Sequence, residues 1–417
     1  MALVWRQLGK HRGESLPLSR THDRLLTVNT SVGPRGGRNV PILYGDSAFS
    51  YCCEQLQGYN RGNISIPLLA LLSLRNLICF SLVLATAAVH ADAPPASSAL
   101  PPGIQPSQLA IVINDAEPNS VEVGEYYRQV HGIPAANVAH VNIANRPRKL
   151  SMDQFAQLKE RIDSQLKPDI QAVLMVWSAP YAVECNSITS AYTLGYDAGQ
   201  CNRSCDPGKP SRYYNSNVTQ PYTQLGMRLS MLLPIDFSEE AKAVADRGAV
   251  RNFSPPPASA YYLTTSDAAR SSRAQLFPPA GTLAQRKLTV KPIKADVLEG
   301  AQDIMIYQTG LAKVDKLDTL RFLPGALADH LTSFGGDLQG SLQMSSQRWL
   351  EAGATASYGT VSEPCSYWQK FPHPGTLLRR YLSGSTALEA YWGSVMWPAQ
   401  GLFIGDPLAA PYANFRR

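Results

Sequence analysis

The feature that most constrains the fold is a succession of apolar runs separated by amphipathic stretches between residues 109 and 177. The run at 109–114 is continuously apolar up to Asn114, which is typical of a strand covered on both faces. A second strand is expected at 137–143 and a third at 170–177. Between them, 120–131 and 151–166 show helical patterning. Strands that alternate with helices predict a mostly parallel sheet flanked by helices, so we expect an α/β domain.

Two serines are expected to begin these helices. Ser120 stands at the start of the first helical stretch, where a hydroxyl can cap the backbone N–H groups. Ser151 stands three residues before Gln154, which is the spacing of a capping box.

The chain continues this pattern after a long interruption. Residues 186–257 are polar and rich in Tyr, Asn, Ser and Pro, which predicts an insertion with little regular structure apart from one helix at 239–247. Further strands are expected at 260–265, 303–307, 323–328 and 354–361, and further helices at 345–351, 375–382 and 387–392. We therefore expect one three-layer α/β domain over 107–417.

A segment with the three parts of a signal peptide precedes this domain. Arg75 supplies the positive end and 77–88 is a short apolar core. Val89-His90-Ala91 places small residues before a cleavage site between Ala91 and Asp92. This pattern predicts an exported protein, located in the periplasm, at the cell surface or outside the cell.

An uncleaved membrane anchor over 66–89 is the alternative. Arg75 and Asn76 interrupt that span and leave an apolar run shorter than the ~20 residues needed to cross a bilayer. We therefore expect 66–91 to be a signal peptide, in contact with the membrane only before cleavage, and 92–106, rich in Pro, Ala and Ser, to be a linker.

Residues 1–65 show neither a helical nor an alternating period. Signal peptides normally begin a chain, so our hypothesis is that translation starts near 66–74 and that 1–65 is a non-structural extension. A genuine cytoplasmic extension is the alternative. Sequencing the amino terminus of the precursor distinguishes the two, because peptides from residues 1–61 would rule out the internal start.

The charge distribution argues against nucleic-acid binding. Residues 1–91 hold 9 Lys or Arg and 4 Asp or Glu, which leaves 29 basic and 28 acidic residues of the chain's 38 and 32 for the exported part. A nucleic-acid binder would concentrate basic residues in its folded part. We expect the partner, if there is one, to be an envelope polysaccharide or protein.

Four cysteines follow the predicted cleavage site. An even number of cysteines in an exported domain predicts disulfides, and three pairings are possible. We favour Cys201 with Cys205, which are close in sequence, and Cys185 with Cys365, which both follow predicted strands. A structural metal site is the alternative, but no cysteine has a histidine at ligand spacing.

Candidate catalytic residues follow the predicted strands, where ligands gather in parallel sheets. They are Glu184, Asp329, His330 and Glu363. A carboxylate can orient an imidazole as a general base, but adjacent residues of one strand point to opposite faces. A hydrogen bond from His330 to the following Gly-rich loop is therefore the simpler interpretation. A less favoured hypothesis is that Cys365 is a nucleophile and that His373 is its base.

Other chemistry is poorly represented in the sequence. No phosphate-binding Gly-rich loop and no Gly-x-Ser-x-Gly elbow occur, and nothing predicts a cofactor or a metal. A set of tryptophans could line a sugar-binding cleft, although helix packing explains Trp349 and Trp392 equally well; the set is Trp349, Trp368, Trp392 and Trp397.

Several long motifs resemble a bacterial family found in species that carry exosortase, a membrane protein-sorting enzyme. They are Val123-Gly-Glu-Tyr-Tyr127, the stretches 132–138, 184–190 and 323–336, Trp349 to Pro364, and Gln400 to Pro407. The resemblance covers about 108–412. It implies a role near the cell envelope and no particular activity.

The chain also resembles, more distantly, the gingipain-type, caspase-like cysteine peptidases. The βαβαβ series and the closing Gly405-Asp406-Pro407 carry this resemblance. Those enzymes have His-Gly after one strand and a nucleophilic Cys after the next, where this chain has Thr309-Gly310 and Asp329-His330. The resemblance therefore implies a caspase-like fold without the expected catalytic residues.

Three functions fit these observations. The first is an exported caspase-like protein without peptidase activity. The second is a divergent hydrolase that uses Asp329 and His330 with Glu184 or Glu363. The third is a carbohydrate-binding protein, which requires exposed tryptophans.

Overall fold

The computed structural model describes residues 103–249 and 256–415, which belong to one of the two compact units of the chain, Ala91–Arg417. The predicted extension at 1–65, the signal peptide at 66–91 with its Ala91–Asp92 cleavage site, and most of the linker at 92–106 lie outside these residues. The last linker residues already belong to the core, because Ile104 is fully buried. Within the described residues, no helix is both long and apolar enough to cross a membrane.

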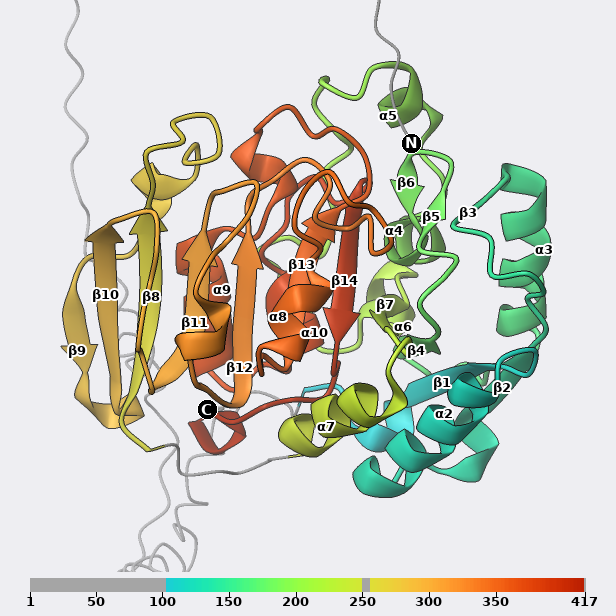
Figure 1. The fold of residues 1–417 in the computed structure, drawn as a ribbon. Coiled ribbons are helices and arrows are strands. Elements are labelled where there is room, and N and C mark those ends of the chain that lie inside the picture. The colour runs from blue at the N-terminus through green and yellow to red at the C-terminus, as the bar shows by residue number, and fades with distance from the viewer. Residues whose placement is uncertain (1–102, 250–255, 416–417) are drawn as a thin grey trace, which may run out of the picture. The chain divides into compact units, whose positions relative to one another are not determined.

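A mostly parallel sheet of 11 strands forms the centre of the domain (Figure 1). Its strand order is β2-β1-β4-β7-β14-β13-β12-β11-β8-β10-β9. The strands are β1 (Leu109–Asn114), β2 (Val138–Val141), β4 (Ala172–Val176), β7 (Leu229–Leu233), β8 (Ala258–Thr264), β9 (Gly281–Leu283), β10 (Leu288–Lys294), β11 (Ile304–Thr309), β12 (Phe322–His330), β13 (Ala356–Thr360) and β14 (Gly401–Gly405). A small second sheet contains β3 (Lys149–Leu150), β5 (Ala182–Val183) and β6 (Asn186–Ser187).

Helices cover both faces of the large sheet and complete the three-layer architecture that the sequence predicts (Figure 1). One face carries α2 (Pro118–His131), α7 (Ser238–Gly248) and α8 (Gln347–Glu351); the other carries α3 (Met152–Asp163), α4 (Ile188–Leu194), α9 (Pro374–Leu382) and α10 (Ala387–Trp392). Two short helices lie in the connections, α5 (Ala198–Asn202) and α6 (Pro221–Leu225).

Apart from the edge strand β9, which is antiparallel to β10, the large sheet consists of two parallel blocks that run in opposite directions. Strands β2, β1, β4, β7 and β14 are mutually parallel, and so are β13, β12, β11, β8 and β10. The antiparallel pair β13–β14 joins the two blocks. The carboxyl ends of β4 and β12 therefore point in opposite directions along the strand axis. Residues that follow strands of the two blocks cannot simply converge on one site.

The prediction of an irregular insertion over 186–257 is wrong. The segment contains the expected helix, α7, but also α4, α5, α6 and the central strand β7. Strand β7 pairs with β4 over five residues and is buried throughout, between β4 and β14. Four apolar residues interrupted by Ser230, within a polar segment, give a weak sequence signal, and burial between two strands stabilises them as a strand.

Local capping follows the sequence for one helix and not for the other. Ser151 caps α3 in a capping box with Gln154, as predicted. Ser120 does not cap α2, which begins earlier, at Pro118. Its buried hydroxyl instead accepts from the Asn114 N–H at 2.8 Å and donates to the Val176 carbonyl at 2.5 Å, so it joins β1 to β4.

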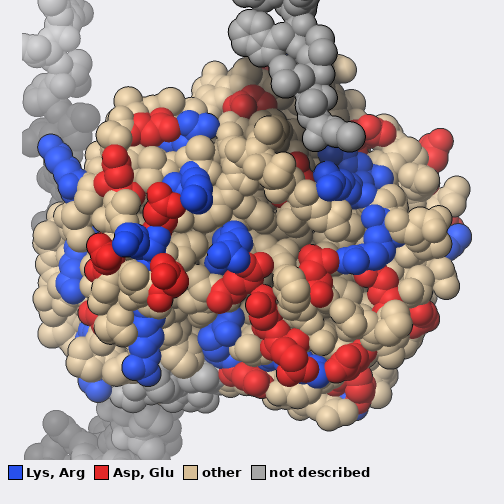
Figure 2. All heavy atoms as spheres, in the orientation of Figure 1, with Lys and Arg blue, Asp and Glu red and all other residues tan. Residues whose placement is uncertain are grey.

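The surface carries charges of both signs. On the face shown in Figure 2, Lys and Arg side chains are interspersed with Asp and Glu. The described residues of this face therefore form no continuous basic stripe, which is the surface that nucleic-acid binders use for phosphates.

Candidate functional site

Asp329 is held in a buried ion pair near the end of β12. Its Oδ1 lies 2.5 Å from Arg273 Nη1, and both side chains are almost completely buried. Gln308 Nε2 donates to its Oδ2 at 2.8 Å. Burial raises the pKa of this carboxyl, and Arg273 and Gln308 oppose the rise. Both oxygens therefore contact protein groups, away from solvent.

Arg273 ties the segment after β8 to the neighbouring strand ends. Its Nη2 donates to the Thr309 carbonyl at 2.9 Å and to the Asp329 carbonyl at 3.2 Å, and its Nη1 donates to the Pro372 carbonyl at 3.3 Å. A guanidinium can bridge several acceptors in this way because its five N–H groups have a fixed geometry. Arg273 therefore holds the segment after β8 against the ends of β11 and β12 and against the loop before α9.

His330 points to the opposite face of β12, as expected for adjacent strand residues. Trp349 Nε1 donates to His330 Nδ1 at 2.9 Å. Nε2 must then carry the ring proton, and it donates to the Met344 carbonyl at 3.1 Å. Met344 belongs to the loop after β12. His330 therefore makes the hydrogen bond to the following loop that the sequence analysis gave as the simpler interpretation. Asp329 and His330 thus have separate partners and do not form a dyad.

Burial lowers the pKa of His330 to about 3, and the hydrogen bond to Met344 only partly opposes the shift. An unfolded histidine has a pKa of about 6.5. Between these values the unfolded chain binds more protons than the folded one, so the free energy of unfolding falls as the pH decreases.

We expect His330 to contribute a loss of up to about 1.4 kcal/mol per pH unit as the pH falls from about 6.5 toward 3. Equilibrium denaturation of the wild-type chain and of His330→Gln at several pH values measures this contribution. The variant should show a shallower pH dependence by that amount. Equal slopes would show that His330 is not kept neutral in the folded protein.

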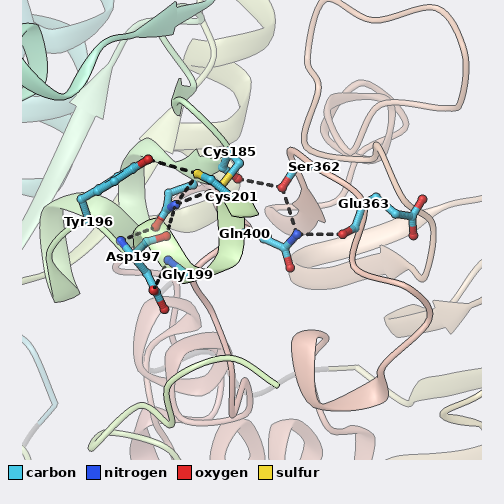
Figure 3. Close-up of a disulfide and its surroundings, with 9 residues drawn as sticks. Cys185, Tyr196, Asp197, Gly199, Cys201, Ser362, Glu363 and Gln400 are labelled. Carbon is cyan, nitrogen blue, oxygen red and sulfur yellow. Dashed lines mark hydrogen bonds between the residues drawn. A yellow bond between two sulfur atoms is a disulfide. The ribbon is translucent and has the colours of Figure 1, made fainter. Parts of the chain in front are cut away.

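The two glutamates lie near a different feature, the Cys185–Cys201 disulfide. Glu184 is exposed, and Glu363 Oε1 accepts from the Cys365 N–H at 2.7 Å. Ser362 Oγ donates to the Cys185 carbonyl at 2.7 Å, which brings the segment after β13 to the segment around β6. Figure 3 shows this contact, with the Glu363 carboxylate turned away from the disulfide.

The four predicted catalytic residues therefore do not form one site. Asp329 and His330 are fully buried on opposite faces of β12. Among the described residues, no hydrogen bond joins either of them to Glu184 or Glu363.

The four cysteines form two disulfides, but the favoured pairing is wrong. Cys185 pairs with Cys201 and Cys205 pairs with Cys365, and each pair has a Cα–Cα distance of 5.2 Å. Helix α5 is the reason, because it places Cys201 against β6, where the Asn186 amide contacts both Cys185 Sγ and Cys201 Sγ.

Cys205 lies beyond the end of α5, beside the loop that follows β13. Its neighbour Ser204 accepts a hydrogen bond from the buried Lys370 through its backbone carbonyl. Cys365 is consumed in the second disulfide, so it cannot act as the nucleophile that we considered with His373. His373 instead accepts from the Thr376 N–H and caps α9.

Comparison with known proteins identifies two distant structural neighbours. The crystal structure of the Arg-specific cysteine proteinase gingipain R shares 11% identity and a TM-score of 0.42, over 73% of this chain and 78% of that chain. A complex of the RgpB pro- and mature domains from Porphyromonas gingivalis shares 10% identity and a TM-score of 0.34, over 73% and 79%. No protein-family model and no curated protein matches the chain, so these comparisons add nothing to the resemblance to the exosortase-linked family.

The tryptophans do not line one cleft. Trp349 and Trp392 are fully buried, where Trp349 bonds His330 and Trp392 stacks on Phe403. Trp368 and Trp397 are partly exposed and contact His373 and Tyr367, respectively. The helix-packing interpretation is therefore correct for the two buried tryptophans.

A polar pocket that the sequence analysis missed lies between the last turn of α9 and the segment 215–219. Its cavity volume is about 400 Å³, and two adjacent arginines, Arg379 and Arg380, line it together with hydroxyl and amide side chains. In the sequence, the adjacent Arg379 and Arg380 and the Asn-, Ser- and Thr-rich segment 215–219 could have indicated a polar binding site. The separation of 164 residues between Asn215 and Arg379 hid this relationship in the sequence.

Proposed function

We propose that this is an exported protein of the cell envelope whose α/β domain binds a partner and has no peptidase activity. One observation carries the proposal: the acid, base and thiol candidates at the end of β12 and after β13 are all engaged by other protein groups. Asp329 is paired with Arg273, His330 is bonded to Trp349 and Met344, and Cys365 is in a disulfide. A cysteine peptidase needs a thiolate with a base in hydrogen-bond reach, and these groups do not provide that pair.

Export is the second part of the proposal. The signal-peptide pattern at 66–91 supports it, and so do the two disulfides, since disulfides persist in oxidising compartments outside the cytoplasm. The link to exosortase systems rests on the sequence resemblance and remains a proposal, as does the absence of peptidase activity from a caspase-like fold. An envelope polysaccharide or an envelope protein is the proposed partner.

A divergent hydrolase is the competing function. It is less favoured because a base must reach substrate, whereas Asp329 and His330 are both fully buried. Glu184 and Glu363 are accessible, but neither has an acid or nucleophile as a hydrogen-bond partner among the described residues.

We expect the purified full-length protein to hydrolyse neither peptide nor glycan substrates above the background rate. The measurement is turnover of peptide and glycan libraries, with heat-denatured protein as the control. Turnover that disappears in Glu184→Gln or Glu363→Gln, with an unchanged circular dichroism spectrum, would overturn the proposal in favour of the hydrolase. These two positions are informative because neither side chain is fully buried, so their substitution should not unfold the protein.

Sequencing of the amino terminus tests export separately. We expect the mature protein from the native cell envelope to begin at Asp92. A mature chain that keeps residues 66–91 would show that the segment is an anchor.

A further inference from the structure

The pocket beside α9 carries positive charge that no acidic side chain neutralises. Among the described residues, neither Arg379 nor Arg380 forms an ion pair with a carboxylate. Each of the other lining residues is uncharged. Elsewhere in the described domain, exposed arginines such as Arg146 and Arg348 do pair with acids. The pocket is therefore a local site of positive potential.

Arg380 is fixed in place by the protein. Its Nε donates to the Glu389 carbonyl at 3.2 Å, its Nη2 donates to the Tyr213 hydroxyl at 3.2 Å, and its Nη1 donates to the Ser216 carbonyl. A Cβ at Gly393 would lie only 2.3 Å from Arg380 Nε, so the guanidinium is packed against the backbone of that residue. Arg380 therefore adds positive charge to the lining of the pocket in a fixed geometry, while its three nitrogens donate to protein groups.

Arg379, in contrast, has N–H groups that are available to bind a ligand. Its side chain is exposed, and Nη2 donates to Asn215 Oδ1 at 2.5 Å. Its Nε and Nη1 donate to no described residue. A guanidinium that is oriented by one hydrogen bond and keeps two N–H directions free can bind a carboxylate or another oxyanion, with the strength of a charge-assisted hydrogen bond.

Uncharged hydrogen-bonding groups surround this cation. The side chains of Asn217, Thr219, Ser383 and Ser385 line the pocket, and none of them forms a hydrogen bond to a described residue. Hydroxyls and amides of this kind both donate and accept, and they suit a ligand that is itself rich in hydroxyls. Val218 is the one apolar side chain of the lining, so the pocket does not suit an apolar ligand.

We propose that this pocket binds an acidic saccharide, with its oxyanion on Arg379 and its hydroxyls on the Asn, Thr and Ser side chains. Charge and hydrogen bonding would recognise the ligand here, in place of the exposed tryptophans that the sequence suggested for a sugar-binding cleft. The proposal deepens the binding function given above, because it names the ligand class and the site. The exposure of Arg379 also allows one sugar residue of a polymer to enter while the chain continues outside. Carboxylated and sulfated saccharides share this chemistry, and the experiment separates them.

The test is calorimetric titration of the purified full-length protein with oligogalacturonate, dextran sulfate, neutral dextran and inorganic phosphate. We expect one of the two acidic saccharides to bind and neutral dextran not to bind. Arg379→Gln should weaken that binding by roughly tenfold to a hundredfold, which is the range for a hydrogen bond to a charged group. Ser383→Ala combined with Ser385→Ala should weaken it further.

Arg161→Gln is the matched control. Arg161 is also an exposed arginine in the last turn of a helix, α3, but it lies outside the pocket. Equal weakening by the two arginine substitutions would show non-specific attraction of a polyanion and overturn the proposal. Failure of both acidic saccharides to bind, or phosphate binding as tight as saccharide binding, would overturn it as well.

The outcomes also separate this inference from the proposed function. If no acidic saccharide binds and no substrate is hydrolysed, only the ligand assignment fails. If an acidic saccharide is cleaved, the proposed lack of enzymatic activity fails, whereas binding that depends on Arg379 would still support the site.

Discussion

Replacing both Cys205 and Cys365 by alanine is expected to lower the free energy of unfolding by about 5 kcal/mol. This disulfide closes a loop with a sequence separation of 160 residues, and the chain-entropy contribution of a cross-link grows with loop length. The loop contains β7 to β13, so the cross-link restricts much of the unfolded chain. Equilibrium denaturation under non-reducing conditions measures the loss.

The Cys185–Cys201 disulfide provides the comparison within the same chain. Its sequence separation is 16, so its removal should lower the free energy of unfolding by about 3 kcal/mol. The two loops do not overlap in sequence, so the two losses should be separable. An equal or larger loss for the shorter loop would contradict this account. Peptide mapping without reduction checks the pairing directly, since the pairing expected from sequence would instead yield a Cys201–Cys205 peptide.

Replacing Asp329 by alanine is expected to lower the free energy of unfolding by about 3–5 kcal/mol. The substitution leaves the Arg273 guanidinium charged and without its carboxylate, although the side chain is only 1% exposed. An uncompensated buried charge is among the largest single sources of instability in a protein. Chemical denaturation of the variant at neutral pH measures the loss.

A double substitution distinguishes the buried charge from simple loss of packing. Arg273→Met with Asp329→Leu removes both charges and keeps apolar volume, so the double variant should be more stable than Asp329→Ala. It should not recover fully, because Arg273 also donates to the Thr309 and Pro372 carbonyls. The single variants Arg273→Met and Asp329→Leu complete the comparison. A loss of stability in the double variant equal to the sum of the two single losses would show that the two charges are not coupled.

Local patterns in the sequence were sufficient for much of the fold. The apolar run at 109–114 is strand β1 with the predicted limits, and the capping box at Ser151 begins α3. The predicted α/β class and mostly parallel sheet are confirmed by the strand order. These features depend on residues close together in sequence, whose period or capping chemistry identifies them without the rest of the protein.

Features that depend on distant partners were predicted poorly. Strand β7 lies in a segment expected to be irregular, and the antiparallel pairing of β13 with β14 places the carboxyl ends of the two blocks at opposite edges. The candidate site shows the same limit. The sequence placed Asp329 and His330 at a strand end, but it could not show that Arg273 and Trp349 occupy their polar atoms.

The α/β class, most of the helices and strands, and the four cysteines available for disulfides thus follow from local sequence patterns. The pairing of the cysteines, the role of His330 as a buried neutral donor, and the hydrogen bond from Arg379 to Asn215 beside a pocket become visible in the folded domain. The physical reason is that helices and capping depend on contacts within a few residues, whereas a pKa, a disulfide or a pocket depends on groups brought together from distant parts of the chain.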